Sequence, residues 1–518
     1  MELFAATLLA IALAWGITLR RRRALRVPLP PSPPSDPILG HLRYIPPKNP
    51  ELQYTAWSKI YGDVIYLRIF SRPIIVLNTA EAAIDLFEKR SWNYSDRPDF
   101  PIFNLMGWGI GLGFLHYGKG FQMQRRLFKE YFSQTKVEEY KNLQTTQARR
   151  LALSIAQGKE DKNDILRVFG TSIIVRIAFG HDMYSENDSN YDEIIRDNGD
   201  AFTQCGPPGG TPVDLFPILQ NFPSWFPGTF FANRAREFYP AIQRLHNYPL
   251  SQVRKQMLEG KAKPSFLSYH LERLQQDGKD ESKPSYEDVK GAASAILGGG
   301  ADTIWATLSV FILAMVLHLE CQEQAQDELD ALLLGSRLPE LGDRDALPYV
   351  ECIIQETYRW LTVAPLGIPH RALRDDVYKG MFIPKGTTVF ANAWGISRDG
   401  AFYQDADSFN PSRYRPKAEG GNEEQFPVFQ FGFGRRVCPG RYLADGSFWI
   451  AATTILSLFK IERAKDVNGD EITPSTGLDT GLTSHPKPYK CNIRFRSEKA
   501  RALLQEVEEE LTNGSEFM

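Results

Sequence analysis

The sequence predicts a mainly α-helical protein with a smaller β region, preceded by one N-terminal transmembrane helix. Long helical patterns, the longest from Tyr286 to Leu319, favour a mainly helical domain. Two short apolar segments between Asp63 and Leu77 predict a pair of strands. An uncharged apolar run, Leu3 to Leu19, has the length of a short membrane span.

The N-terminal run predicts a signal anchor (residues 1–23, with the transmembrane part at about 3–19). Glu2 precedes the apolar run, and four consecutive arginines, Arg20 to Arg23, follow it. A cleavable signal peptide, the alternative, would carry its positive charge before the run. The positive-inside rule places the rest of the chain in the cytosol. We therefore expect a single-pass protein of the endoplasmic reticulum membrane.

The remaining chain divides into three parts. Residues 24–40 are rich in proline and predict a stiff hinge. Residues 41–496 predict one large domain, because the motifs described below converge on one site. Residues 497–518 form a charged, helix-prone tail to which the sequence assigns no role. The formal net charge of −2 gives no reason to expect nucleic acid as a partner.

The five cysteines are scattered and include no C-x-x-C pair, which argues against a disulfide framework and for a reducing compartment. Four of them are predicted to be ordinary thiols: Cys205, Cys321, Cys352 and Cys491. Cys438 differs, because it lies in a glycine-rich, doubly basic loop that runs from Phe431 to Gly440.

This loop suits a thiolate that binds a bulky planar ligand. Gly432, Gly434 and Gly440 allow close approach of the backbone. Backbone N–H groups, the start of a helix and a metal would each stabilise a thiolate. Arg436 could neutralise a carboxylate on the same ligand. The alternative is a plain buried cysteine.

The spacing F-x-x-G-x-R-x-C-x-G resembles the haem-binding loop of the cytochrome P-450 superfamily. The resemblance covers about Pro30 to Phe495 and implies that residues 41–496 are a haem-thiolate catalytic domain with the cytochrome P-450 fold. It further implies that the Cys438 thiolate is the axial ligand of haem b (iron protoporphyrin IX). A thiolate ligand favours O–O cleavage. The other haem-binding residues in the loop would be Phe431, Gly432, Arg436 and Gly440.

The longest helical pattern is interrupted by three glycines, Gly298 to Gly300, which cost about 1 kcal/mol each relative to alanine. With Asp302 and Thr303 they resemble the family motif [AG]-G-x-[DE]-T, which implies a helix that crosses the haem and opens for dioxygen and water. A hydroxyl backed by a carboxylate can relay protons, so Asp302 and Thr303 are the candidate catalytic residues. The alternative is a solvent-facing Asp-Thr pair.

The resemblance also supplies candidates that bind the haem propionates. Arg125 and His370 match the family's positions, with Arg371 as the alternative to His370. Phe121 stands where the family usually has a tryptophan that contacts a propionate. Because phenylalanine cannot donate a hydrogen bond, the role of Phe121 stays open.

Three further charged residues match a structural triad of the family beneath the haem. Glu356 and Arg359 have the i, i+3 spacing of one helix face, and Arg413 follows in the segment from Phe409 to Tyr414. An isolated E-x-x-R is usually a solvated ion pair. The resemblance implies a buried network in this chain.

Two loops are candidates for substrate access. The segment from Trp92 to Gly113 shows no clear period and predicts a long loop over the haem. Its candidate pocket-lining residues are Phe100, Phe103, Leu105, Met106 and Trp108. The apolar, breaker-rich segment from Gly206 to Phe231 predicts a second membrane contact and channel mouth, with burial against neighbouring helices as the alternative.

The family implies a haem-dependent monooxygenase that inserts one oxygen atom from O2 into a lipophilic small molecule. Electrons would come from NADPH through a separate flavoprotein reductase, for which four residues could form a basic docking face: Arg125, Arg126, Lys129 and Arg441. The segments YSDRP, VDLFP and PSWFP resemble fungal, membrane-bound enzymes of secondary metabolism, which favours hydroxylation of a terpenoid or polyketide-like substrate. The alternatives are an isomerase, dehydratase or peroxygenase of the family, or a non-catalytic haem electron carrier.

Overall fold

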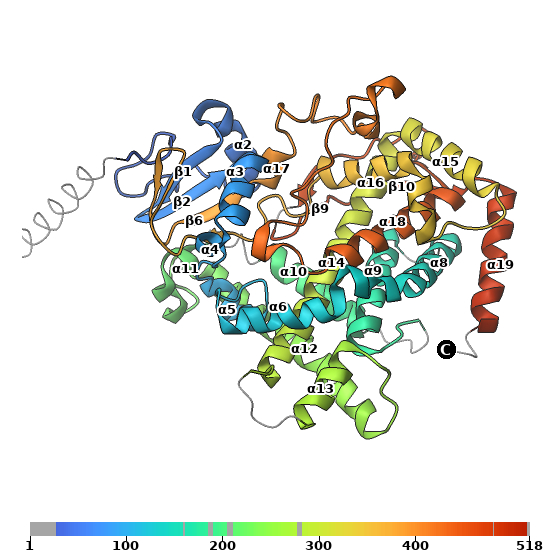
Figure 1. The fold of residues 1–518 in the computed structure, drawn as a ribbon, viewed down its shortest axis with the longest axis horizontal. Helices are drawn as coiled ribbons and strands as arrows, with labels where there is room; N and C mark the ends of the chain where they lie inside the picture. Colours follow the sequence, from blue (N-terminus) through green and yellow to red (C-terminus); the bar gives the residue numbers. More distant parts are fainter. Residues whose placement is uncertain are drawn as a thin grey trace, which may run out of the picture.

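The computed structural model describes residues 27–158, 161–184, 190–204, 211–276, 282–479 and 481–514. The predicted N-terminal anchor lies outside these residues. The described chain is mainly helical with a small sheet region, as predicted, and the sheet lies at one end of the molecule (Figure 1). The helices are α2 (Pro50–Tyr61), α3 (Ala80–Ile84), α4 (Ser91–Tyr94), α5 (Pro101–Met106), α6 (Lys119–Phe132), α7 (Gln134–Val137), α8 (Lys141–Gln157), α9 (Lys162–Phe179), α10 (Asn190–Gln204), α11 (Pro212–Leu215), α12 (Phe230–Leu258), α13 (Phe266–Gln276), α14 (Tyr286–Leu317), α15 (Leu319–Leu333), α16 (Pro348–Trp360), α17 (Ala393–Ile396), α18 (Arg441–Leu458) and α19 (Glu498–Gly514).

The strands form one four-stranded sheet and three two-stranded pairs in the described part of the chain. The larger sheet has the order β1-β2-β6-β3, in which β2 and β6 are parallel and the other pairs antiparallel. The smaller pairs, all antiparallel, are β4 with β5, β7 with β10 and β8 with β9. The strands are β1 (Val64–Ile69), β2 (Arg72–Leu77), β3 (His370–Arg371), β4 (Asp376–Tyr378), β5 (Met381–Ile383), β6 (Thr388–Ala391), β7 (Phe459–Arg463), β8 (Leu478–Asp479), β9 (His485–Pro486) and β10 (Cys491–Phe495).

The predicted strand pair between Asp63 and Leu77 is confirmed. Its register pairs Tyr66 with Ile75, and Phe70 makes the tight connection with a positive φ of 52°. Four consecutive residues of β2, from Ile74 to Leu77, are buried. Ile75 and Leu77 belong to one hydrophobic cluster and Ile74 and Val76 to another, so both faces of the strand pair are packed.

Helix α14 passes through the middle of the molecule (Figure 1). It begins at a capping box in which Ser285 and Asp288 satisfy each other's backbone N–H groups. Among the described residues, α14 is the one helix long and apolar enough to cross a membrane, but 72% of its apolar window is buried within the molecule. A helix that is apolar all round suits this place at the centre of the core.

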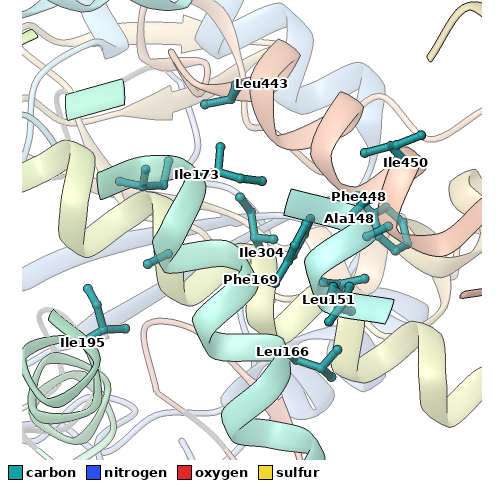
Figure 2. Packing of buried hydrophobic residues seen from close by; sticks show 14 of the residues in the cluster. Ala148, Leu151, Leu166, Phe169, Ile173, Ile195, Ile304, Leu443, Phe448 and Ile450 are labelled. Carbon is teal, nitrogen blue, oxygen red and sulfur yellow. The ribbon is translucent and has the colours of Figure 1, made fainter. Parts of the chain in front are cut away.

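The main hydrophobic core lies where α8, α9, α14 and α18 meet, and Figure 2 shows side chains of all four helices converging there. Phe169 of α9 and Leu151 of α8 are fully buried, and Ile304 of α14 and Phe448 of α18 are almost so. This packing holds α14 and the start of α18 in fixed relation, which positions the site described below.

The segment from Trp92 to Gly113 is partly helical, so the prediction of a long irregular loop is wrong there. It contains most of α4, the whole of α5 and a 3₁₀ turn at Trp108–Ile110. Helix α5 begins at Pro101, and the N–H of Ile102 donates to the carboxylate of Asp214 at 3.1 Å. Since the capping carboxylate comes from a distant part of the chain, the local sequence carried no N-cap signal for this helix.

The tail predicted to be helix-prone forms α19, which packs against α8 and α18. Ala500 and Leu504 are buried in the main core. The described part of the tail is therefore a structural element of the domain.

Candidate active site

A cavity of about 420 Å³ lies between α14 and the loop that precedes α18. Its wall brings together eleven of the residues that the sequence analysis singled out, although they are spread over more than 300 positions of the chain. They are Trp108, Phe121, Arg125, Asp302, Thr303, His370, Phe431, Gly432, Arg436, Cys438 and Gly440.

Cys438 lies in the cavity wall just before the first turn of α18. Its backbone N–H donates to the carbonyl of Phe431 at 2.8 Å, which closes the loop around the thiol. Burial raises the pKa of the Cys438 thiol, while the N–H of Gly440 and the charges of Arg125 and Arg441 act to lower the pKa. Burial outweighs the other effects, so the pKa is raised overall, and the thiolate would form when a metal ion replaces the thiol proton.

The glycines of this loop leave room on the cavity side. A Cβ on Gly432 or Gly440 would meet no atom within 4 Å, so nothing of the protein fills the space beside them. Gly432 and Gly434 both have a positive φ, of 73° and 55°, but Gly434 has a different role, because a Cβ there would overlap the carbonyl of Phe87. The loop is open toward a ligand and tightly packed behind it.

The two arginines and the histidine predicted to bind propionates line the cavity, and the hydrogen bonds they make go to backbone carbonyls. Arg125 donates to Val437 at 2.6 Å, and Arg436 donates to Ser95 at 2.7 Å. His370 shares a hydrogen bond of 2.5 Å between its Nδ1 and the carbonyl of Tyr94.

Between His370 and Arg371, which the sequence left as alternatives, the structure places only His370 in the cavity wall. Arg371 lies 2.6 Å from the carboxylate of Asp96 in an ion pair. Asp96 also accepts from the N–H of Tyr117, and its charge acts to raise the pKa values of the cavity residues Arg97 and Arg436.

Sequence reasoning missed a third arginine of the cavity wall, Arg97. It is 4% exposed, lines the cavity and donates to the carbonyls of Gly113 and Ile368. Burial and the charge of Arg436 hold the pKa of Arg97 well below its ordinary value. Asp96, its neighbour in sequence, forms its ion pair with Arg371.

The three arginines among these residues repel one another across an apolar cavity. The pKa of Arg436 is lowered to about 10, mainly by burial and in part by the charge of Arg125, while the charge of Asp96 acts to raise it. Burial and the charges of Arg97 and Arg436 also lower the pKa of His370. A planar ligand with carboxylates at one edge would relieve this repulsion, so the residues present fit haem b with Cys438 as its iron ligand.

The three consecutive glycines of α14 differ in the structural reason for which a side chain is absent. A Cβ on Gly298 would lie 2.5 Å from the ring of Trp108, and one on Gly300 would lie 2.7 Å from Ile174, so both allow close packing. A Cβ on Gly299 would meet nothing within 4 Å. Gly299 therefore leaves an open groove in the cavity wall beside Thr303, whose hydroxyl donates to the Gly299 carbonyl at 2.9 Å.

The Asp302 carboxylate is directed toward the β8–β9 hairpin, with hydrogen bonds to Thr483 and His485. The Thr483 hydroxyl donates to Oδ2 at 2.6 Å, and His485 Nε2 lies 3.1 Å from Oδ1. Burial acts to raise the pKa of Asp302, but the charge and hydrogen bond of His485 and the Thr483 hydroxyl outweigh it and hold the pKa below its ordinary value.

Comparison with known proteins agrees with this site. The family model "Cytochrome P450" matches residues 30–493. A "Cytochrome P450 monooxygenase 136" of Postia placenta is 36% identical over 96% of this chain and 94% of its own length. A "Cytochrome P450 monooxygenase claR" of Ampulloclitocybe clavipes is 38% identical over 94% of this chain and 90% of its own. A "Tryptamine 4-monooxygenase" of Psilocybe cyanescens is 34% identical over 92% of this chain and 95% of its own length.

The chain belongs to the cytochrome P450 family. Its curated relatives are fungal monooxygenases, and it is a P450 monooxygenase by that membership. Haem with a cysteine thiolate ligand is the cofactor that the family implies.

Several candidate lining residues of this P450 lie away from the cavity. Phe100, Phe103 and Met106 are buried in the main core, and Leu105 packs partly buried against it. Phe103 supports the wall indirectly, because its ring stacks on Phe114, with centroids 4.4 Å apart. Distant segments supply lining residues that no local pattern indicated, among them Phe114, Ile174, Phe202, Ile368 and Leu482.

The three residues assigned to the structural triad of this P450 form one buried network. Glu356 lies 2.8 Å from Arg359 and 3.1 Å from Arg413, and all three side chains have no exposed surface. The Tyr414 hydroxyl donates to Glu356 at 2.9 Å, and Arg413 also pairs with Glu424. The network ties α16 to the segment that follows Phe409.

Proposed function

We propose that this P450 inserts one oxygen atom from O2 into a lipophilic small molecule, with electrons from NADPH delivered by a separate flavoprotein reductase. The observation that carries the proposal is that Cys438 and the groove at Gly299 and Thr303 belong to one cavity. A thiolate ligand and an open groove with a hydroxyl are the two features that oxygen activation needs.

Three arginines and one histidine of the chain would hold the haem: Arg97, Arg125, Arg436 and His370. Cys438 would be its axial ligand, with Phe431, Gly432 and Gly440 beside it. When bound, the haem supplies the activation of dioxygen. The rest of the cavity wall is mostly apolar, so it excludes water and holds an apolar substrate against the groove.

The distal part of the cavity favours an uncharged, apolar substrate such as a terpenoid or polyketide-like secondary metabolite. Trp108 and Phe202 stack with ring centroids 5.3 Å apart, and Phe114 lies beside them. Among the described lining residues, Asp302 is the one carboxylate, and it is already paired with His485. An amine such as the one named for the Psilocybe relative would find no free counter-ion here.

Surface features support the proposed partners. Arg126 and Lys129 are exposed on α6, on the same helix as the haem-binding Arg125, and would steer an acidic reductase to the haem.

In the segment after Gly206, described from residue 211, the exposed side chains include Phe216, Ile218 and Trp225. We propose that this apolar surface contacts the endoplasmic reticulum membrane, to which the N-terminal segment anchors the chain.

The test of the haem assignment is the difference spectrum of the reduced protein with carbon monoxide. Wild type should show the thiolate-type Soret shift, Cys438→Ser should lose it, and the matched control Cys352→Ser should keep it. A thiolate-type spectrum retained in Cys438→Ser would overturn the ligand assignment.

The test of the reaction is incorporation of oxygen-18 from labelled O2 into product, with NADPH and a fungal P450 reductase. Lipophilic candidates are first screened by the spin-state change that they cause on binding. Product without labelled oxygen would support the isomerase or dehydratase alternative, and product formed only with hydrogen peroxide would support a peroxygenase. Binding without any turnover would support the electron carrier.

A further inference from the structure

We propose that the substrate of this P450 has an apolar skeleton that already carries an oxygen atom, and that this oxygen accepts a hydrogen bond from the indole N–H of Trp108. The inference rests on the monooxygenase reaction proposed above and narrows its substrates to uncharged lipophiles with a ketone, lactone, ether or hydroxyl group. The observation that carries it is a buried N–H group without a partner in the wall of the cavity.

Trp108 buries a hydrogen-bond donor that the protein itself does not use. The residue is 2% exposed and lines the cavity. Within the described part of the chain, its Nε1 has no hydrogen-bond partner. A buried indole N–H usually finds a partner, because leaving it unpaired costs free energy relative to its state in water. A ligand oxygen in the cavity would remove that cost.

The packing of the Trp108 ring does not explain its N–H. The ring stacks on Phe202 with centroids 5.3 Å apart, and the ring of His246 meets it at a steep angle with centroids 5.5 Å apart. Nε2 of His246 lies 3.0 Å from the carbonyl of Gly107, and no hydrogen bond joins His246 to the indole. These contacts need a flat aromatic ring, which phenylalanine would also supply.

The N–H belongs to the edge of the indole that faces α14. A Cβ on Gly298 would lie 2.5 Å from Cη2 and 3.0 Å from Cζ2 of Trp108, whereas Gly111 lies against Cε3 and Cζ3 of the opposite edge. Nε1 is bonded to the same ring carbon as Cζ2. Gly298 directly precedes Gly299, whose missing side chain leaves the groove beside Thr303. A substrate oxygen bonded to Trp108 is therefore held on the α14 side of the cavity.

Most other polar groups of the cavity wall are already bonded within the protein. Besides Trp108, two described lining residues have a buried polar side-chain atom without a partner, the hydroxyl of Thr362 and the carbonyl oxygen of Gln430. The Gln430 oxygen can only accept, so Thr362 is the competing donor. Four lining threonines donate their hydroxyl protons to protein oxygens: Thr303, Thr307, Thr357 and Thr483.

An indole N–H selects an acceptor more sharply than a hydroxyl does. The N–H of Trp108 is fixed in the plane of the ring and can only donate, whereas the Thr362 hydroxyl rotates and can donate or accept. A protonated amine, which has no lone pair to offer, gains nothing from Trp108. The bond also fixes how the substrate lies relative to α14, which makes Trp108 a specificity-determining residue.

The first test compares two ligands with the same carbon skeleton, the sesquiterpene hydrocarbon valencene and its ketone nootkatone. Their affinities for the haem-loaded protein are measured by equilibrium dialysis and by the spin-state change. The ratio of the two affinities, ketone over hydrocarbon, should be about 2- to 13-fold larger in wild type than in Trp108→Phe, which corresponds to one neutral hydrogen bond of about 0.5–1.5 kcal/mol. Because the ratio compares two ligands in the same protein, a change of cavity shape common to both cancels.

Two further variants assign the effect to Trp108. Trp449→Phe is the matched control, because Trp449 is fully buried, has an unpartnered Nε1 among the described residues and does not line the cavity. It should keep the wild-type ratio. Thr362→Val removes the competing donor and should also keep the ratio. A ratio that falls in Thr362→Val and stays in Trp108→Phe would overturn the assignment to Trp108.

A second readout needs neither a variant nor turnover. Ultraviolet resonance Raman spectra of tryptophan contain a band that shifts when the indole N–H forms a hydrogen bond. Trp108 is the one tryptophan among the described lining residues, so nootkatone should shift this band in wild type and valencene should not. The shift should persist in Trp449→Phe and vanish in Trp108→Phe. If Trp108→Phe fails to retain haem, the wild-type spectrum decides, and a bound ketone that causes no shift overturns the proposal.

The outcomes separate recognition from reaction. Equal affinity ratios in wild type and Trp108→Phe would overturn recognition by Trp108 and leave the proposed function intact. If wild type binds neither ligand, the tightest hit of the lipophile screen and its deoxygenated analogue replace them, and a hit without an oxygen atom overturns the proposal. Ketone binding that depends on Trp108, with no labelled oxygen in any product, would defeat the proposed function alone.

Discussion

The guanidinium of Arg436 lies over the ring of Phe121, with its Cζ 3.7 Å from the ring centroid. Phe121 stands where the family usually has a tryptophan, and the sequence left its role open. The contact gives the ring a function that needs no hydrogen-bond donor, because an aromatic face attracts a cation. Phe121 thus holds Arg436 in the cavity wall while Arg436 donates to backbone carbonyls.

We expect Phe121→Leu to weaken haem retention by about 2- to 30-fold, which corresponds to a cation–π contribution of about 0.5–2 kcal/mol. Phe121→Trp should retain haem at least as well as wild type. The measurement is haem transfer to an apo-globin acceptor. The control is Phe179→Leu, a buried phenylalanine that stacks on Tyr191 away from the cavity wall. Equal loss in Phe121→Leu and Phe179→Leu would argue against a specific contact with Arg436.

Thr303→Ala should divert electrons from product to hydrogen peroxide, because it removes the hydroxyl that lies beside the open groove at Gly299. The peroxide share of NADPH consumption should rise several-fold, as expected for loss of a group that handles protons. Thr303→Ser should restore most of the coupling. Unchanged coupling in Thr303→Ala would remove this residue from proton handling.

Glu356→Gln should lower the free energy of unfolding by about 3–5 kcal/mol, because it leaves Arg359 and Arg413 buried without their shared counter-ion. Urea unfolding followed by circular dichroism and by the Soret band measures the loss. Glu419→Gln is the control, since Glu419 pairs with Arg415 at the surface, where an ion pair is worth about 0–1 kcal/mol. A similar small loss in both variants would mean that the buried network is dispensable.

Charge reversal on α6 should slow reduction by the reductase. The double variant Arg126→Glu, Lys129→Glu should raise the KM for reductase about threefold or more at low salt, with the difference shrinking as salt screens the charges. The carbon monoxide spectrum should stay unchanged. Arg501→Glu on α19 is the matched control for an exposed arginine. Equal effects of the two charge reversals would place the docking face elsewhere.

Burial lowers the pKa of His246 to about 4, while its Nε2 lies 3.0 Å from the carbonyl of Gly107. The unfolded chain therefore binds a proton at higher pH than the folded chain does. The stability that His246 contributes is complete above about pH 6.5 and is lost as the pH falls toward 4. Between pH 7 and pH 5 the linkage amounts to about 2 kcal/mol.

The matching measurement is the free energy of unfolding at pH 7 and pH 5 in wild type and His246→Gln. Glutamine does not titrate, so the variant should lose about 2 kcal/mol less between the two pH values. His318→Gln serves as a control. Burial also lowers the pKa of His318, but the carboxylate of Glu320 beside His318 partly offsets this lowering. An identical pH dependence in wild type and His246→Gln would show that His246 is accessible to protons in the folded protein.

The sequence predicted the site best where its residues lie in one short segment. Each of the two motifs, the loop from Phe431 to Gly440 and the glycine-rich turn of α14, lies within ten consecutive residues. The local sequence pattern was therefore enough to identify Cys438 and Thr303 as candidates. Prediction from the sequence was least successful between Trp92 and Gly113. There α5 depends on a cap from Asp214, and the aromatic residues of the segment pack partly inward.

Taken by itself, the amino-acid sequence determined the family, the mainly helical class and the residues that match the family's haem-binding positions, because these depend on local spacing and periodicity. Only the tertiary structure decided which partner each charged group has. Asp96 neutralises Arg371 and leaves Arg97 to the cavity, and Asp302 bonds Thr483 and His485. The physical reason is that hydrogen bonds and ion pairs act over a few ångströms in space, where residues 181 to 275 positions apart in sequence meet.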